Sequence, residues 1–160
     1  MARSAYREAV TYFEQALTAL RHLPEQRHTQ EQAIDLCDDL SSALQALGEF
    51  RQRFPYLREA ETLAEMLGDQ RRLWQICTHM THAFWTTGDY DNALTCGQRA
   101  LTLAAATEDA VQQARVYGFL GTVYFSLGDY RRAIDVFRQA IPSYEGEWRH
   151  ARFGGMMIAA

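Results

Sequence analysis

Apolar residues recur at spacings of three and four along most of this chain, and that spacing is typical of amphipathic helices. The clearest case lies between positions 28 and 47, where the apolar positions are Ala33, Leu36, Cys37, Leu40, Leu44 and Leu47. We expect helices at about 4–22, 28–47, 50–67, 70–87, 90–105, 109–127 and 130–143, and an eighth that begins near 147. Because no apolar run reaches about 18 residues, the pattern predicts no membrane-spanning helix.

A short stretch of sequence occurs three times at a fixed spacing. Gly48, Gly88 and Gly128 are 40 residues apart, and each is followed by an acidic residue and then by an aromatic one. We expect the glycine to end one helix, because it adopts a left-handed backbone without steric cost, and the acidic residue to accept N–H groups at the start of the next. The aromatic side chains, Phe50, Tyr90 and Tyr130, should then wedge between the paired helices. A period of this size is typical of a solenoid.

Pairs of alanines follow the second and third glycines. Ala93 and Ala100, like Ala133 and Ala140, are seven residues apart, which is about two helical turns. Each pair therefore lies on one face, where the small side chains should let another helix approach closely.

One local conflict appears at Arg53-Phe54-Pro55, inside the expected helix 50–67. Proline removes a helical hydrogen bond and clashes one turn back unless it stands in the first turn. We therefore expect this helix to start late or to kink.

These repeats resemble a known family. The third copy is similar to the tetratricopeptide repeat at nearly every signature position, namely Tyr117, Leu120, Gly121, Tyr124, Gly128, Asp129, Tyr130, Ala133, Phe137 and Ala140. The second copy departs at Cys77, Met80 and Thr81, and the first departs at Cys37, Leu40, Ser41, Leu44 and Arg53. The spacing of 40 exceeds the usual ~34 and resembles extended variants in bacterial signalling proteins. The resemblance implies an all-α, right-handed superhelical solenoid of antiparallel helix pairs, with about eight helices.

The repeats predict one continuous array over residues 1–160. Residues 4–27 would be the second helix of an incomplete repeat, because Tyr6, Ala9, Phe13 and Ala16 match that part of the pattern. Three repeats follow at 28–67, 70–107 and 109–145, and 146–160 would begin a truncated further repeat. We expect the sequence to be a fragment of a longer array.

Composition and charge narrow the class of protein. The formal net charge is −4 and all 16 basic residues are arginine, so the basic surface of a nucleic-acid binder is not expected. The start of the chain lacks the apolar core of a signal peptide, which favours the cytoplasm. Three scattered cysteines do not suggest disulfides. Because phosphate loops and the common catalytic motifs are missing from the sequence, we expect neither an enzyme nor a cofactor.

The resemblance also implies where a partner binds. In tetratricopeptide arrays the first helix of each repeat lines the concave groove, so this groove would be lined by Asp35, Asp38, Ser42, Gln45, Gln75, Thr78, His79, His82, Trp85, Arg115, Thr122 and Phe125. Trp85 and Phe125 are the expected aromatic anchors, and the charged residues and histidines would orient the ligand. A metal at His79 and His82 would need ligands such as Cys77 or Asp38, and the spacing does not ensure a third ligand, so no metal is expected.

The predicted function is therefore a protein-interaction scaffold that binds a peptide or protein segment in the groove. Two alternatives stay open on sequence grounds. The array would be a regulatory sensor segment of a bacterial signalling protein that binds a small ligand or signalling peptide, or it would self-associate through its open ends. Neither nucleic acid nor a membrane is an expected partner.

Overall fold

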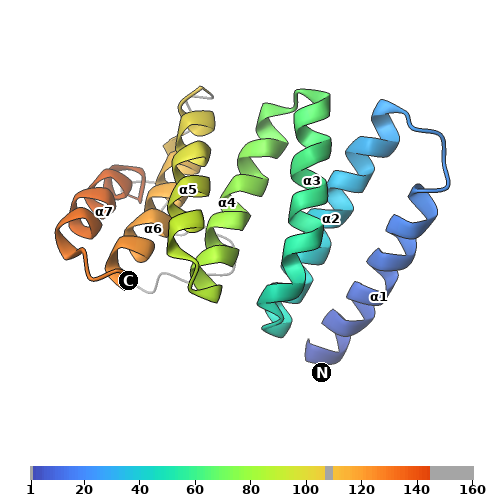
Figure 1. Ribbon diagram of the computed structural model, residues 1–160, viewed down its shortest axis with the longest axis horizontal. Helices are drawn as coiled ribbons and strands as arrows, with labels where there is room; N and C mark the ends of the chain where they lie inside the picture. The colour runs from blue at the N-terminus through green and yellow to red at the C-terminus, as the bar shows by residue number, and fades with distance from the viewer. Residues whose placement is uncertain (1, 107–109, 145–160) are drawn as a thin grey trace.

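The computed structural model describes residues 2–106 and 110–144, and this part of the chain is all-α, with no strand (Figure 1). It holds seven α-helices and one 3-10 helix, which are α1 (Ala2–Leu20), α2 (Arg27–Leu47), η1 (Phe50–Arg53), α3 (Phe54–Leu67), α4 (Gln70–Thr87), α5 (Tyr90–Ala105), α6 (Ala110–Ser126) and α7 (Tyr130–Tyr144). The helical pattern in the sequence is thus confirmed. The helix expected near 147 lies outside the described residues.

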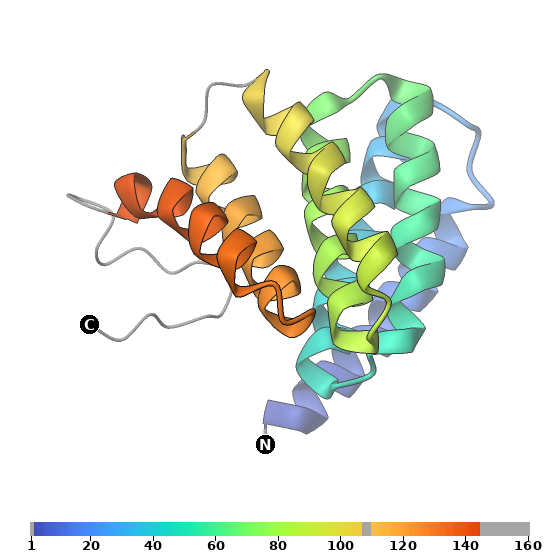
Figure 2. The same ribbon diagram turned by 60° about the vertical axis from the view of Figure 1, so that its left-hand side comes forward.

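Successive helices run antiparallel and pack against their neighbours in the sequence, so that α2 with α3, α4 with α5, and α6 with α7 form hairpins. Helix α1 packs on α2, and α4 also contacts α6. Figure 2 shows the hairpins stacked one after another along the array. This arrangement is an all-α solenoid of helix pairs, as the repeated stretch predicts.

Glycine ends four of the helices in a left-handed conformation. Gly48, Gly88 and Gly128 have φ angles of 79°, 81° and 77°, as the repeats predict, and Gly68 has a φ of 65°. Gly68-Asp69 therefore performs the same turn between α3 and α4 that the other copies perform within a hairpin. The repeat pattern does not reveal this turn, because the turn falls between the repeats and no aromatic residue follows it.

The acidic residues after these glycines differ in role. The side chains of Asp69, Asp89 and Asp129 each accept a backbone N–H three residues later, which is the expected capping bond. Glu49 makes no such bond, so the prediction is wrong for the first copy. A 3-10 helix follows there instead, and α3 begins at Phe54 with Pro55 in its first turn. The late start of this helix is thus confirmed, since the first turn does not need the N–H that proline lacks.

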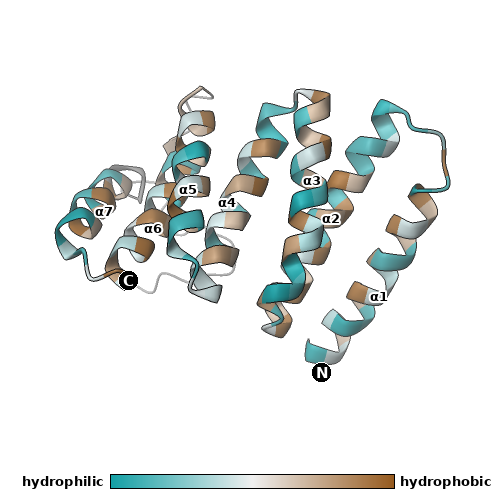
Figure 3. Ribbon diagram, in the orientation of Figure 1, coloured by the Kyte–Doolittle hydropathy of each residue, from teal (hydrophilic) through white to brown (hydrophobic). Residues whose placement is uncertain are grey.

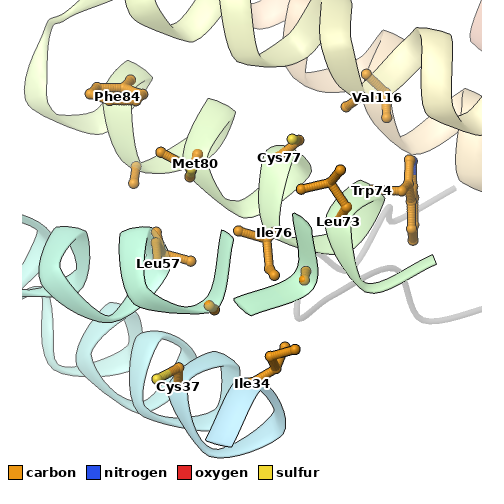
Figure 4. Close-up of a cluster of buried hydrophobic side chains, with 14 of the residues drawn as sticks. Ile34, Cys37, Leu57, Leu73, Trp74, Ile76, Cys77, Met80, Phe84 and Val116 are labelled. Carbon is orange, nitrogen blue, oxygen red and sulfur yellow. The ribbon is translucent and has the colours of Figure 1, made fainter. Parts of the chain in front are cut away.

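The core lies between the two helices of each pair and between successive pairs. Figure 4 shows its central part, where Ile34 and Cys37 of α2, Leu57 of α3 and Ile76 of α4 are at most 2% exposed. Figure 3 shows that apolar and polar positions alternate around each helix. The four alanines of the repeat pattern, Ala93, Ala100, Ala133 and Ala140, are also buried, which confirms their role in close helix packing.

The three aromatic residues after the glycines do not behave alike. Phe50 and Tyr90 are partly buried, and Tyr90 packs on the core. Tyr130 is 59% exposed and meets the ring of Phe125 edge-on at 5.4 Å, so the expected wedge is wrong for this copy. Helix α7 is the last described helix, and Tyr130 shares its exposed side with Ile134 and Ile141.

Gly97 marks the closest approach of α5 to α6. A Cβ atom at this position would press on Leu120 Cδ2, and it would lie 2.9 Å from Leu120 Cγ and 3.3 Å from Thr81 Cγ2. Leu120 and Thr81 are both buried, so neither has open space into which to turn. Only glycine fits here without movement of its neighbours.

We therefore expect Gly97→Ala to lower the free energy of unfolding by about 1–2 kcal/mol, although alanine favours a helix more than glycine does. Urea unfolding followed by circular dichroism measures this loss. In a Leu120→Ala background the same change should cost much less, because the obstructing side chain is gone. An equal cost in both backgrounds would contradict the packing explanation.

Candidate functional site

The first helices of the repeats, α2, α4 and α6, carry the residues that the sequence predicted for a binding groove. Asp35, Asp38, Ser42 and Gln45 lie on α2, Gln75, Thr78, His79, His82 and Trp85 lie on α4, and Arg115, Thr122 and Phe125 lie on α6. Hydrogen bonds join Asp38, His79 and Arg115 into one row that crosses all three helices. We call the surface that carries this row the α2/α4/α6 face. The face thus joins residues that are 36 to 41 positions apart in the sequence.

A chain of three polar side chains crosses this face. His79 Nδ1 lies 2.5 Å from Asp38 Oδ1, and His79 Nε2 lies 3.1 Å from Arg115 Nη2. A guanidinium can only donate, so Nε2 must accept and the ring proton must be on Nδ1, where it is donated to Asp38. His79 therefore bridges Asp38 on α2 and Arg115 on α6 through its two ring nitrogens.

A second polar cluster lies beside the first and is buried. The Arg53 side chain is 0% exposed, its Nε donates to Ser41 Oγ at 3.0 Å, and its Nη1 donates to His82 Nδ1 at 3.1 Å. Nη2 is buried and has no hydrogen-bond partner among the described residues. Burial, opposed by the charge of Asp38, lowers the pKa of Arg53 to about 10. Arginine thus occupies a position where the repeat pattern calls for a small residue.

His82 accepts the hydrogen bond from Arg53, and this contact requires an unprotonated Nδ1. Burial, together with the neighbouring Arg53, His79 and Arg115, lowers the pKa of His82 to about 4. The ring also meets Trp85 and Phe119 edge-on, with centroid distances of 5.5 and 5.3 Å. His82 is therefore a neutral packing residue with one hydrogen bond, and it is less able to orient a ligand than the sequence suggests.

The acidic end of the face is already neutralised. Arg72 Nε and Nη2 each lie 2.9 Å from a different oxygen of Asp35, and Arg72 Nη1 lies 2.7 Å from Asp69 Oδ2. Arg72 was not among the groove residues expected from the sequence. Its signal was the spacing of 37 residues from Asp35, which is close to the repeat period, but spacing alone does not show which arginine faces which carboxylate.

The two expected aromatic anchors differ in exposure. Trp85 is half-buried and its Nε1 donates to Ser126 Oγ at 2.9 Å, whereas Phe125 is 60% exposed. Phe125 therefore exposes most of its ring to solvent, while Trp85 exposes only part of its ring. Thr78 is a correction, because it is fully buried and its hydroxyl donates to the carbonyl of Trp74 inside α4, so it cannot contact a ligand.

Among the described residues, the structure brings no complete set of metal ligands together at His79 and His82. Within residues 2–106 and 110–144, no cluster of three or more histidine, cysteine or acidic side chains could hold a metal ion. Cys77 is buried, which raises the pKa of its thiol to about 12, and Nδ1 of His79 is held by Asp38. The other two cysteines are also free, and burial raises the pKa of Cys37 to about 12 and of Cys96 to about 11.

The fold defines the class as an all-α helical-repeat solenoid, and comparisons with known proteins agree with this class. The tetratricopeptide repeat model matches residues 74–146. The TPR domain of Arabidopsis FLU superposes with a TM-score of 0.68 at 17% identity, over 72% of this chain and 98% of that one. BtubC from P. vanneervenii superposes with a TM-score of 0.61 at 16% identity, over 98% of this chain and 81% of that one. Residues 74–146 therefore match the tetratricopeptide repeat family, and the described chain has the fold of tetratricopeptide repeat domains.

A curated relative matches over a shorter stretch. The 43 kDa receptor-associated protein of the synapse from Tetronarce californica is 31% identical over 99 residues, which are 60% of this chain and 23% of that protein. This chain thus spans about a quarter of the relative's length. Tetratricopeptide repeats in general mediate binding between proteins, and none of the described helices is long and apolar enough to cross a membrane.

Proposed function

We propose that this array binds a peptide or protein segment on the α2/α4/α6 face and acts without catalysis. The observation that carries the proposal is Phe125, an aromatic residue of α6 whose side chain is 60% exposed. Trp85 on α4 is half-buried and bonds to Ser126, the residue after Phe125, and the row formed by Asp38, His79 and Arg115 joins the same two helices to α2. Aromatic anchors surrounded by fixed polar groups are typical of protein interfaces.

The row formed by Asp38, His79 and Arg115 supports this function because its side chains are held in place by hydrogen bonds. Its side chains already have partners, so they form a preorganised surface and do not have to be ordered when a segment binds. The Asp38 carboxylate keeps lone pairs that can accept a further bond, which favours an extended segment that crosses successive repeats. We infer that affinity comes mainly from Phe125 and that the polar row fixes direction.

We expect Phe125→Ala to abolish most partner capture while it leaves stability nearly unchanged, because the side chain is mostly outside the core. The matched control is Tyr12→Ala, which removes an aromatic ring that is 67% exposed on α1, away from the proposed face. The two variants and the wild type are compared in pull-downs after circular dichroism confirms equal helicity. An equal loss of partner capture in both variants would indicate nonspecific hydrophobic adsorption and would contradict the proposal.

A photo-crosslinking amino acid at position 125 then identifies what touches the face. An adduct with another protein supports the proposal, and the absence of any adduct overturns it. An adduct of twice the chain mass would support self-association, which the exposed apolar side of α7 with Tyr130, Ile134 and Ile141 favours as a second candidate. The sensor alternative stays a prediction from the repeat length.

A further inference from the structure

Two clefts lie between α3, α4 and α5, and neither belongs to the α2/α4/α6 face. One encloses about 570 Å³ and is lined by residues that include Arg51, Phe54, Arg58, Phe84 and Asp89. The other encloses about 410 Å³ and is lined by residues that include Arg58, Phe84 and Arg99. Because Arg58 and Phe84 line both, the two clefts form one groove, which we call the α3/α5 groove. Figure 1 shows α3 and α5 on either side of α4.

The charged side chains of this groove differ in whether they already have a hydrogen-bond or ion-pair partner. At its α5 end, Arg99 contacts Glu61 at 2.6 Å and Glu65 at 2.5 Å. Asp89 accepts a bond from the Asn92 side chain at 2.8 Å and a longer one from the Asn92 backbone at 3.4 Å. The guanidinium groups of Arg51 and Arg58 are exposed and have no hydrogen bond or ion pair within the described residues. The end of the groove near η1 therefore carries two arginines, Arg51 and Arg58, that form no ion pair within the described residues.

An aromatic surface lies between these two cations. Arg51, Phe54 and Arg58 follow at steps of three and four residues, so they share one side of η1 and α3. The Phe54 ring is half-buried and packs against Phe84, with centroids 4.7 Å apart and an interplanar angle of 39°. The groove thus presents a cation, an apolar ring and a second cation in a line.

We propose that the α3/α5 groove binds an acidic peptide segment in which an aromatic side chain stands between two acidic residues. The two guanidinium groups hold the two carboxylates through paired N–H bonds, which arginine forms more readily than lysine. The aromatic side chain covers the exposed part of Phe54. This surface is separate from the α2/α4/α6 face, so an experiment can support or contradict binding at one site without deciding binding at the other.

The probe is the peptide acetyl-Glu-Phe-Glu-amide, titrated into the isotope-labelled 160-residue chain and followed by nuclear magnetic resonance. We expect backbone signals of Phe54, Phe84 and Gly88 to shift. The neutral peptide acetyl-Gln-Phe-Gln-amide should bind roughly tenfold more weakly, because it keeps the shape and loses both charges. N-acetylphenylalanine tests whether a terminal carboxylate is preferred.

The double variant Arg51→Gln, Arg58→Gln should weaken binding of the acidic probe by about tenfold, whereas Arg71→Gln should leave it unchanged. Arg71 is equally exposed but lines neither cleft. Equal binding of the neutral probe, no shift in the groove, or tighter binding of N-acetylphenylalanine would overturn the proposal. Phe125→Ala serves as a second reference, since its loss should affect the α2/α4/α6 face and leave this titration unchanged.

Discussion

Replacement of Arg53 by alanine is expected to lower the free energy of unfolding by about 3 kcal/mol, which is among the largest effects of any single change in this chain. The substitution leaves a cavity where a fully buried side chain stood, and it removes the donors for Ser41 Oγ and His82 Nδ1. Urea denaturation at neutral pH measures the loss. A matched control is Arg51→Ala, an exposed arginine two positions earlier, which should change stability by less than about 0.5 kcal/mol.

Arg53→Met separates the contribution of volume from that of charge. Methionine fills much of the same space and removes a guanidinium whose Nη2 has no partner among the described residues. Because a desolvated charge gains little net stability, this variant should stay within about 1 kcal/mol of the wild type. If methionine is as damaging as alanine, the hydrogen bonds of Arg53 hold the first two repeats together, and the packing explanation is wrong.

Acidification from pH 7 to pH 5 is expected to remove about 2 kcal/mol of stability through His82 alone. The folded state holds the pKa of this ring at about 4, because of burial and of the cations Arg53 and Arg115 together with His79. The unfolded chain has the ordinary histidine pKa of about 6.5. A pKa that is lowered by folding adds stability above the unfolded value, and this stability is lost as the pH falls toward the folded value. The sensitive window is therefore about pH 6.5 to 4.

His82→Gln tests this assignment, because glutamine has no proton to gain in this range and still offers an oxygen to Arg53. Its unfolding free energy should fall less between pH 7 and pH 5 than that of the wild type. His28→Gln removes an exposed histidine and should keep the steep dependence. The readout is the difference between the two pH values, so any packing cost of the substitution cancels. An unchanged slope in His82→Gln would place the acid sensitivity elsewhere.

These two residues change how the α2/α4/α6 face is understood. The sequence suggested a groove in which histidines and charges wait for a ligand. In the structure Asp35, His79 and His82 are bonded to arginines from neighbouring elements. Asp38 is bonded to His79. The polar groups therefore join the repeats, and of the two expected aromatic anchors only Phe125 has a mostly exposed ring.

The local features of the fold could be predicted from the sequence because their causes are local. Helix α4 was expected at 70–87 and spans Gln70–Thr87, because apolar spacing and glycine placement define both ends. The late start of α3 followed from Pro55 in the same way. The sequence could not show whether Glu49 caps the next helix. A glutamate side chain is longer than that of aspartate, and whether it reaches the backbone N–H groups depends on the path of the turn.

The site depended on distances between repeats, which periodicity does not supply. Helical spacing placed His79 and His82 near one another, but it could not show that one bonds to Asp38 and Arg115 while the other accepts from Arg53. Thr78 illustrates the same limit, because a shift of one residue around the helix turns a side chain from the face into the core. The α3/α5 groove arises only where two helices flank a third, so it could not be predicted from the periodicity of the chain.

By itself, then, the sequence determined the helices, their period of 40 residues and the solenoid that they form, because backbone preferences and amphipathic spacing act over a few residues. Only the tertiary structure decided which polar side chains are already paired and which surfaces stay open. That outcome depends on how successive hairpins are rotated and separated, since a hydrogen bond forms only when donor and acceptor come within about 3 Å. Arg53 was an irregularity in the repeat pattern, and packing made it the buried link between α2 and α4.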